Sequence, residues 1–219
     1  MDKKLYDLCV RVLNEELLPA MGCTEPIAVA YCAALARDTL GAKPDRAEIF
    51  VSGNILKNVK SVIVPNTGGL KGVVSAAAAG IVAGVSEKKL ECLSSVTGAQ
   101  REEISVYKTQ AAFSVEKSRS DSVFDIAIRV YHNENSAYVR IAERHTNVVK
   151  VTKNGNTLLD KECECQSNTD ECTRDDLTVK KIYDFVSHAD LSEITPLLER
   201  QIAYNSAIAE EGLKNDYGA

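Results

Sequence analysis

The apolar positions of this chain follow a helical period near both ends and a period of two between them. Leu5, Cys9 and Leu13 recur once per turn, which predicts an amphipathic helix over residues 3–18 that Pro19 ends. The further elements expected are a helix from the N-cap Thr24 to about Gly41, a strand at 47–52, helices at 70–85, 87–95 and 99–112, strands around 124–130, 137–141 and 149–151, and helices at 177–187 and 191–215.

The alternating segment predicts how the middle of the chain folds. Ile126 and Ile128 would lie on one face of a strand, and Asp125 and Arg129 on the other. Asn154-Gly155 is a strong hairpin signal, so an antiparallel meander is expected. The fold class is therefore α+β, with a mixed or antiparallel sheet, flanking helices, an N-terminal helical pair, and C-terminal helices that would continue into a further helical domain.

Changes in the pattern also suggest a domain organisation. The expected parts are an N-terminal helical segment at 1–46, an α+β domain at 47–162, an acidic cysteine-containing loop at 163–176, and C-terminal helices at 177–219.

Composition narrows the classes of partner. The net charge of −5 argues against a nucleic-acid or anionic-membrane surface, since phosphate binding needs an excess of Lys and Arg. No apolar run reaches the length of a membrane span, and the start of the chain lacks a secretory signal. The seven cysteines, an odd number, argue against a disulfide framework. The cytoplasm is the expected compartment.

The strongest chemical candidate is the run Gly22-Cys23-Thr24-Glu25-Pro26, just before the second helix. A thiol at a helix N-terminus feels the positive end of the dipole, which favours the thiolate that attacks or binds metal. A small residue that merely starts a helix is an equally good interpretation on spacing alone.

Three polar runs are weaker candidates. Ser52-Gly53-Asn54, with Lys57 and Asn58, could bind a carboxylate, and Pro65-Asn66-Thr67-Gly68-Gly69 could cradle an anion before a helix. Polar or glycine-rich turns explain both runs at least as well. His145, followed by Thr146 and Asn147, could act as an acid or base near neutral pH.

Cys163, Cys165 and Cys172 form a cysteine group in the acidic loop. Three thiols could hold zinc or help to bind a cluster. The spacing matches no common zinc pattern and a fourth ligand is missing, so a solvated loop is the favoured interpretation.

Taken together, Pro19-Ala-Met-Gly-Cys-Thr-Glu-Pro26, Ser52-Gly-Asn-Ile-Leu-Lys-Asn58, Pro65-Asn-Thr-Gly68 and His145-Thr-Asn147 resemble the L-cysteine desulfidases and their relatives, which are akin to the iron–sulfur L-serine dehydratases. The order of these motifs fits as well, and the resemblance spans residues 5 to 219. It implies a lyase that uses a [4Fe–4S] cluster, without pyridoxal phosphate, to convert L-cysteine to pyruvate, ammonia and sulfide.

By this resemblance Cys23 is a cluster ligand and the partner is a small amino-acid substrate. The implied site comprises the catalytic candidates His145 and Lys57 and the substrate-binding candidates Ser52, Gly53, Asn54, Asn58, Thr67, Gly68, Thr146 and Asn147. Members of the family are longer, with a C-terminal helical region that supplies the other cluster cysteines. We therefore expect this chain to be a truncated part, inactive without a C-terminal helical domain or subunit, and we consider a homodimer reasonable.

Three other functions stay open on the sequence. One is an L-serine dehydratase of the same type, because the elimination of hydroxide and that of hydrosulfide need similar catalytic groups. The others are non-catalytic: a metal-binding or regulatory module that uses the acidic cysteine loop, and an assembly domain that docks a helical subunit.

Overall fold

The computed structural model describes residues 2–161 and 173–215. The chain forms two compact units, one made of Ala20–Cys165 and the other of Met1–Pro19 together with Gln166–Ala219. We call them the sheet unit and the helical unit, and each is described by itself.

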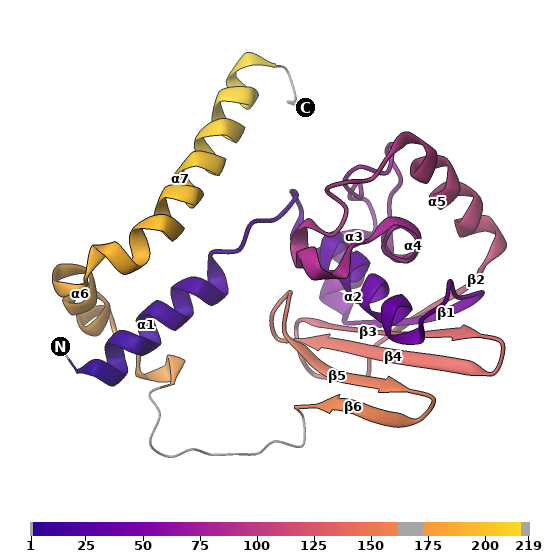
Figure 1. The fold of residues 1–219 in the computed structure, drawn as a ribbon, viewed down its shortest axis with the longest axis horizontal. Coiled ribbons are helices and arrows are strands. Elements are labelled where there is room, and N and C mark those ends of the chain that lie inside the picture. The colour runs from indigo at the N-terminus through magenta and orange to yellow at the C-terminus, as the bar shows by residue number, and fades with distance from the viewer. Residues whose placement is uncertain (1, 162–172, 216–219) are drawn as a thin grey trace. The chain divides into compact units, whose positions relative to one another are not determined.

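The sheet unit contains all the strands of the described chain. Its elements, in order, are α2 (Thr24–Leu40), β1 (Arg46–Val51), α3 (Gly53–Val59), α4 (Val73–Ala83), the 3₁₀ helix η1 (Ser86–Glu91), α5 (Gly98–Gln110), β2 (Ala112–Lys117), β3 (Asp125–His132), β4 (Asn135–Ala142), β5 (Val148–Lys153) and β6 (Asn156–Asp160). Helices α2 to α5 lie on one side of the sheet (Figure 1).

The sheet has six strands in the order β2-β1-β3-β4-β5-β6. Strands β3 to β6 form the antiparallel meander that the sequence predicts, and the hairpin turn at Asn154 and Gly155 has the positive φ angles, 50° and 79°, that this turn requires. Strand β1 joins β3 antiparallel and β2 parallel, with α3, α4 and α5 in the crossover. The α+β class and the mixed sheet are thus confirmed.

The two faces of the sheet differ in character. Ile126, Ile128 and Val130 are fully buried beneath the helices, as their alternation predicts. Arg129 on the other face is exposed, and no helix of the described sheet unit covers that face (Figure 1). We call it the open face.

Helix α2 is the centre of the core. It is buried along nearly its whole length, with α4 against one side and β3 and β4 against another. The contact with α4 is close, since a Cβ atom added at Gly80 would overlap the carbonyl oxygen of Ala30 and lie 2.7 Å from its carbonyl carbon. Only glycine fits there, which explains why α4 is built from small residues.

Several expected boundaries need correction. Helix α3 begins directly after Ser52, where we expected a polar turn, because the Ser52 hydroxyl accepts a hydrogen bond from the Ile55 N–H and caps the helix. The N-cap of α2 is Cys23 rather than Thr24. The helix expected at 87–95 is the short 3₁₀ helix η1, because Lys89 has a φ of 48° that breaks an α-helix.

The helical unit contains α1 (Lys3–Glu16), the short η2 (Arg174–Asp176), α6 (Val179–His188) and α7 (Leu191–Lys214). Its small core holds Leu5, Leu8, Cys9 and Phe185. Since α1 groups with the C-terminal helices and α2 with the sheet, the compact units do not follow the segment 1–46 that we expected.

Polar contacts reinforce the helical unit. The Tyr6 hydroxyl donates a 2.6 Å hydrogen bond to Glu193, which raises the pKa of Tyr6 to about 12. Arg174 in η2 pairs with Glu15 and Glu16 of α1, both at 2.7 Å. This turn lies at the end of the segment that we expected to be an unstructured acidic loop.

Within the described ranges, none of the helices combines the length and the apolar character that crossing a bilayer requires.

The Gly80 contact gives a stability prediction. We expect Gly80→Ala to lower the free energy of unfolding by about 2 kcal/mol, because the overlap with Ala30 outweighs the gain in helix propensity of about 1 kcal/mol. Urea unfolding followed by circular dichroism measures this change. Gly98→Ala is the control, since a Cβ atom at Gly98 meets nothing within 4 Å. Equal stability of the two variants would contradict the close contact.

Candidate functional site

Cys23 lies at the N-terminus of α2, where the chain turns into the helix. It follows Gly22, which has a φ of 94°, and its side chain is half-buried. The thiol makes no helix-capping bond; it donates to the Glu25 carboxylate, with Sγ 3.1 Å from Oε2. The thiol is therefore held against a carboxylate two residues further along the chain.

Glu25 connects Cys23 to other segments of the sheet unit. Its Oε1 accepts a hydrogen bond from the Asn58 side chain at 3.4 Å, and its Oε2 accepts one from the Thr24 hydroxyl at 3.4 Å. The hydrogen bond from Cys23 is the main cause that lowers the pKa of Glu25, and Asn58 and the charge of His145 lower it further. Glu25 is thus an ionised acceptor at the centre of the group.

Three separate elements bring these side chains together. Cys23 and Glu25 start α2, Asn58 lies in the last turn of α3, and His145 lies in the connection between β4 and β5. The His145 ring stacks in a tilted arrangement on Phe124, with 4.4 Å between ring centroids. We call Cys23, Glu25, Asn58 and His145 the Cys23 cluster.

The Cys23 thiol is harder to ionise than the sequence suggested. Burial raises the pKa of Cys23 above its ordinary value, and the hydrogen bond to Glu25 and the charge of that carboxylate raise it further. Our expectation that the helix dipole would favour the thiolate is wrong for this isolated thiol, because burial and the nearby carboxylate oppose it. A cation bound at the sulfur would reverse this balance.

Other predicted binding residues use their side chains within the fold. The Ser52 hydroxyl donates to the Val123 carbonyl at 2.7 Å while it caps α3, and Thr67 donates to the Val64 carbonyl at 2.7 Å. The Asn147 side chain donates to the Ala142 carbonyl at 3.0 Å. These bonds hold in place α3, the glycine-rich loop and the turn that carries His145.

The remaining candidates do not belong to the group around Glu25. Gly53, Asn54 and Lys57 are exposed on α3, and Gly68 is exposed in its loop with a φ of 74°. Thr146 is half-buried beside His145. Their substrate-binding and catalytic roles stay predictions.

Sequence reasoning missed Glu25. We named it only within the run around Cys23, because an acidic side chain is common in the first turn of a helix. The available signal was an acid two residues after a cysteine and next to a proline. Its hydrogen bond with Asn58 and its electrostatic interaction with His145 depend on long-range packing.

The described residues offer one thiol ligand and no complete metal site. Cys9, Cys32 and Cys92 are buried, whereas Cys23 is half-buried. Among residues 2–161 and 173–215 no three His, Cys, Asp or Glu side chains gather as metal ligands would. Cys163, Cys165 and Cys172 lie outside the described residues.

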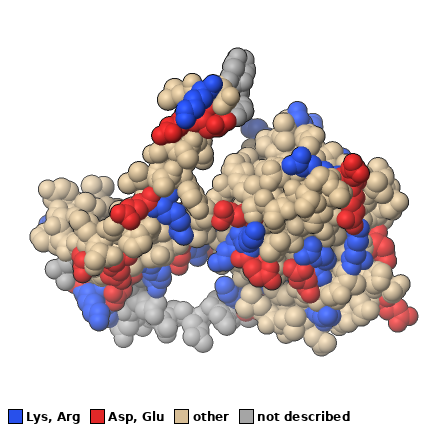
Figure 2. Space-filling view, turned by 45° about the horizontal axis from the view of Figure 1, so that its top comes forward, with Lys and Arg blue, Asp and Glu red and all other residues tan. Residues whose placement is uncertain are grey.

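Charged side chains are mixed on the surface seen in Figure 2. Basic and acidic groups there are interspersed over the sheet unit and do not gather into a broad field of one sign. Such a mixture is typical of an ordinary solvated surface, whereas backbone phosphates are bound by clustered Lys and Arg. The absence of a nucleic-acid partner stays a prediction.

Comparison with known proteins gives clear sequence relatives. A UPF0597 protein of Desulfitobacterium hafniense is 44% identical over 219 residues, which cover 99% of this chain and 50% of the relative. UPF0597 proteins of Finegoldia magna and Treponema denticola are 44% and 38% identical, over 94% and 100% of this chain and 50% and 51% of their own lengths.

No family model matches the chain, and no solved structure is similar to it. The chain spans about half the length of the curated relatives that it matches. Over that half, it is similar to UPF0597 proteins along essentially its whole sequence.

Proposed function

We propose that this chain is part of an iron–sulfur-dependent, pyridoxal-phosphate-independent lyase that acts in the cytoplasm. The reaction is the elimination of sulfide from L-cysteine, which yields pyruvate and ammonia. The observation that carries the proposal is the Cys23 cluster, in which a thiol, a carboxylate, a carboxamide and an imidazole meet at the end of the central helix.

The chemistry of the cluster suits an elimination. The reaction breaks the Cα–H and Cβ–S bonds of L-cysteine, and the resulting enamine takes up water to give pyruvate and ammonia. The imidazole of His145 is a type of side chain that can accept the α-proton near neutral pH. Asn58 donates one amide hydrogen to Glu25, which holds its side chain in place, and its second amide hydrogen can orient a substrate carboxylate.

The fit of a [4Fe–4S] cluster to this chain is partial. Cys23 provides one thiol beside the site, whereas such a cluster takes three or four thiolates. When bound, a cluster with one open iron supplies a Lewis acid for the leaving group. The other ligands are proposed to come from the part of the whole protein that this chain does not include, since the relatives are about twice as long.

L-Serine is the alternative substrate of the same site. Its β-hydroxyl leaves as water where L-cysteine loses sulfide, and the groups around Cys23 would assist both reactions alike. We propose L-cysteine because the motifs around Cys23, Ser52 and His145 resemble those of the cysteine desulfidases.

A specific observation favours an additional role in assembly. All residues from 201 to 215 of the described α7 region are exposed, including Ile202 at 64% and Leu213 at 89%. These two residues are eleven positions apart and share a helix face. Helices of this kind are usually stabilised by packing, so we propose that α7 docks the remaining region of the whole protein.

The contact between Cys23 and Glu25 predicts a change in thiol reactivity. Glu25→Gln removes the charge that raises the pKa of Cys23, so the thiolate fraction at pH 8 should increase, by up to about tenfold for each pKa unit. Mass spectrometry of the Cys23 peptide after timed alkylation measures this rate. Glu87→Gln, a change of an exposed carboxylate elsewhere, should leave the rate unaltered. An unchanged rate in Glu25→Gln would disprove the contact.

Anaerobic reconstitution tests the lyase proposal. This chain, combined with the remaining region of the Desulfitobacterium hafniense relative and given iron and sulfide, should bind a cluster and release sulfide from L-cysteine. Cys23→Ser should abolish the cluster absorbance and lower the activity at least a hundredfold, since a ligand is lost. Cys92→Ala, which removes a fully buried thiol, should retain both. A Cys23→Ser complex with normal iron content and activity would refute the proposal.

Docking by α7 can be tested by co-purification of the same two pieces. Ile202→Asp with Leu213→Asp should weaken the complex at least tenfold, because two charges enter an apolar contact. Gln201→Asp adds a charge to an adjacent exposed position and should bind normally. Equal recovery of both variants would rule out docking through this face.

A further inference from the structure

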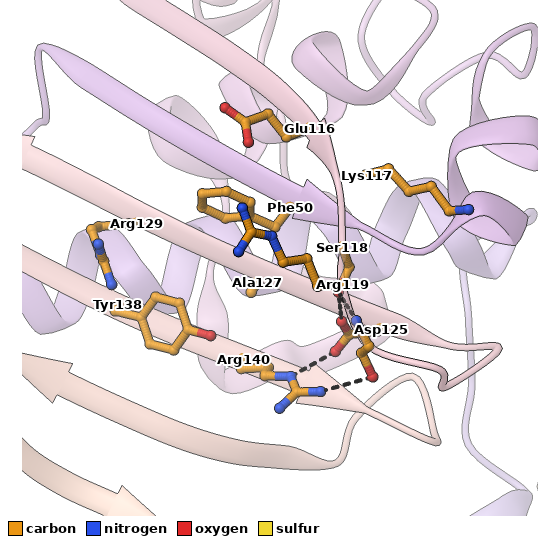
Figure 3. Close-up of a pocket in the computed structure, with 11 residues that line it drawn as sticks. Phe50, Glu116, Lys117, Ser118, Arg119, Asp125, Ala127, Arg129, Tyr138 and Arg140 are labelled. Carbon is orange, nitrogen blue, oxygen red and sulfur yellow. Dashed lines mark hydrogen bonds and ion pairs between the residues drawn. The ribbon is translucent and has the colours of Figure 1, made fainter.

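A basin lies on the open face of the sheet. It has a volume of about 560 Å³, within the range of small-molecule sites. Its lining comes from β1, β2, β3 and β4 and from the segment that follows β2 (Figure 3). None of the four cluster residues lines it.

The register of the strands explains why the sheet is hollow here. Ala127 of β3 lies between Phe50 of β1 and Arg140 of β4 in one row across the sheet. A methyl group between two long side chains leaves a depression, and Ala127 forms its floor. Arg129 and Tyr138, paired in the next row on this face, form a side of the basin.

An ion pair and hydrogen bonds connect the side chains at one end of the basin. Asp125 is almost fully buried and accepts a 2.7 Å ion pair from Arg140 and a hydrogen bond from the Ser118 hydroxyl. Arg140 also donates to the Ser120 hydroxyl at 3.1 Å. The negative charge of Asp125 is thus already compensated by groups of the protein.

The lining carries an excess of positive charge in an acidic protein. Four basic side chains, Lys117, Arg119, Arg129 and Arg140, face two acidic ones, Glu116 and Asp125. Glu48 of β1 lies opposite Arg129 in the strand register but does not line the basin, and in Figure 3 Arg119 extends back over the basin toward the Phe50 ring. A cationic basin on a chain with a net charge of −5 attracts small anions.

The aromatic side chains of the lining indicate which apolar group an anionic ligand would carry. The Arg129 guanidinium lies 5.2 Å from the centre of the Tyr138 ring, a cation–π contact that orients this group beside the basin. The Phe50 and Tyr138 rings offer flat apolar surfaces next to guanidinium groups, which bind carboxylates and phosphates through paired hydrogen bonds. We propose that the basin binds a small anion that carries a planar ring, either a phosphate ester or a carboxylate.

Calorimetric titration of the 219-residue chain tests this site. The probes are adenosine 5′-monophosphate and 4-hydroxybenzoate, with inorganic phosphate and adenosine as partial ligands. At least one complete probe should bind saturably in the millimolar range or below, and at least tenfold more tightly than its parts. The probe that binds more tightly identifies the acid group.

Matched variants locate the binding. Arg129→Gln should weaken it at least tenfold, and Ala127→Leu, which fills the floor, should weaken it similarly in a protein whose circular dichroism is unchanged. Arg46→Gln is the control, because Arg46 stacks on Tyr131 at 3.7 Å on the same strands but does not line the basin. The control should bind as the parent does.

Several results would overturn the proposal. One is the absence of saturable binding of either probe up to roughly 10 mM, a Kd at which the binding free energy is only about −2.7 kcal/mol. The others are phosphate binding as tight as that of the nucleotide, and unchanged affinity in Arg129→Gln. The proposal would also be overturned if the chain bound neither probe but formed a dimer that the Arg129→Gln substitution dissociates. That result would identify this face as an interface between copies of the chain. None of these outcomes bears on the lyase proposal, since the two sites share no residue.

Discussion

The close approach of α4 to α2 is the contact on which the sheet unit depends. With Gly80 directly against the Ala30 carbonyl, α2 is held between α4 and the central strands and is buried almost completely. A helix fixed in this way has a fixed N-terminus, so the position of Cys23 is determined by packing more than ten ångströms of helix away, at about 1.5 Å of rise per residue. The thiol, Glu25 and the bond to Asn58 therefore depend on a core contact in which none of them takes part.

Much of the fold could be predicted because apolar periodicity reports directly on burial. The alternation through Ile126 and Ile128 gave the correct buried face of β3, and Asn154 with Gly155 gave the correct hairpin. Helix α3 could not be predicted from Ser52 onward, because Gly53 and Asn54 are poor helix formers that favour turns. Strand β2 itself was not predicted, so its parallel pairing with β1 was missed as well. Apolar alternation in any case specifies a strand's face and not its neighbour.

The candidate site was only partly predictable. Motif order singled out Cys23, Asn58 and His145, and the structure links all three to Glu25. The sequence could not show that Glu25 is the residue they share, because the segments carrying Asn58 and His145 reach it only through the packing of α3 and the sheet on α2. It also suggested the wrong direction for the pKa of Cys23, since the dipole argument considered neither the burial of the thiol nor its nearest carboxylate.

The buried cysteines of the sheet unit have a consequence for how the fold opens. Cys32 on α2 points toward the Val139 carbonyl and Cys92 toward the Ile27 carbonyl, and both are fully buried. Burial raises the pKa of Cys92 to about 12 and that of Cys32 further. Neither sulfur can react with a solvent-borne oxidant until α2 separates from its neighbours. The rate at which these two thiols are modified in the native protein therefore reports how often α2 opens locally.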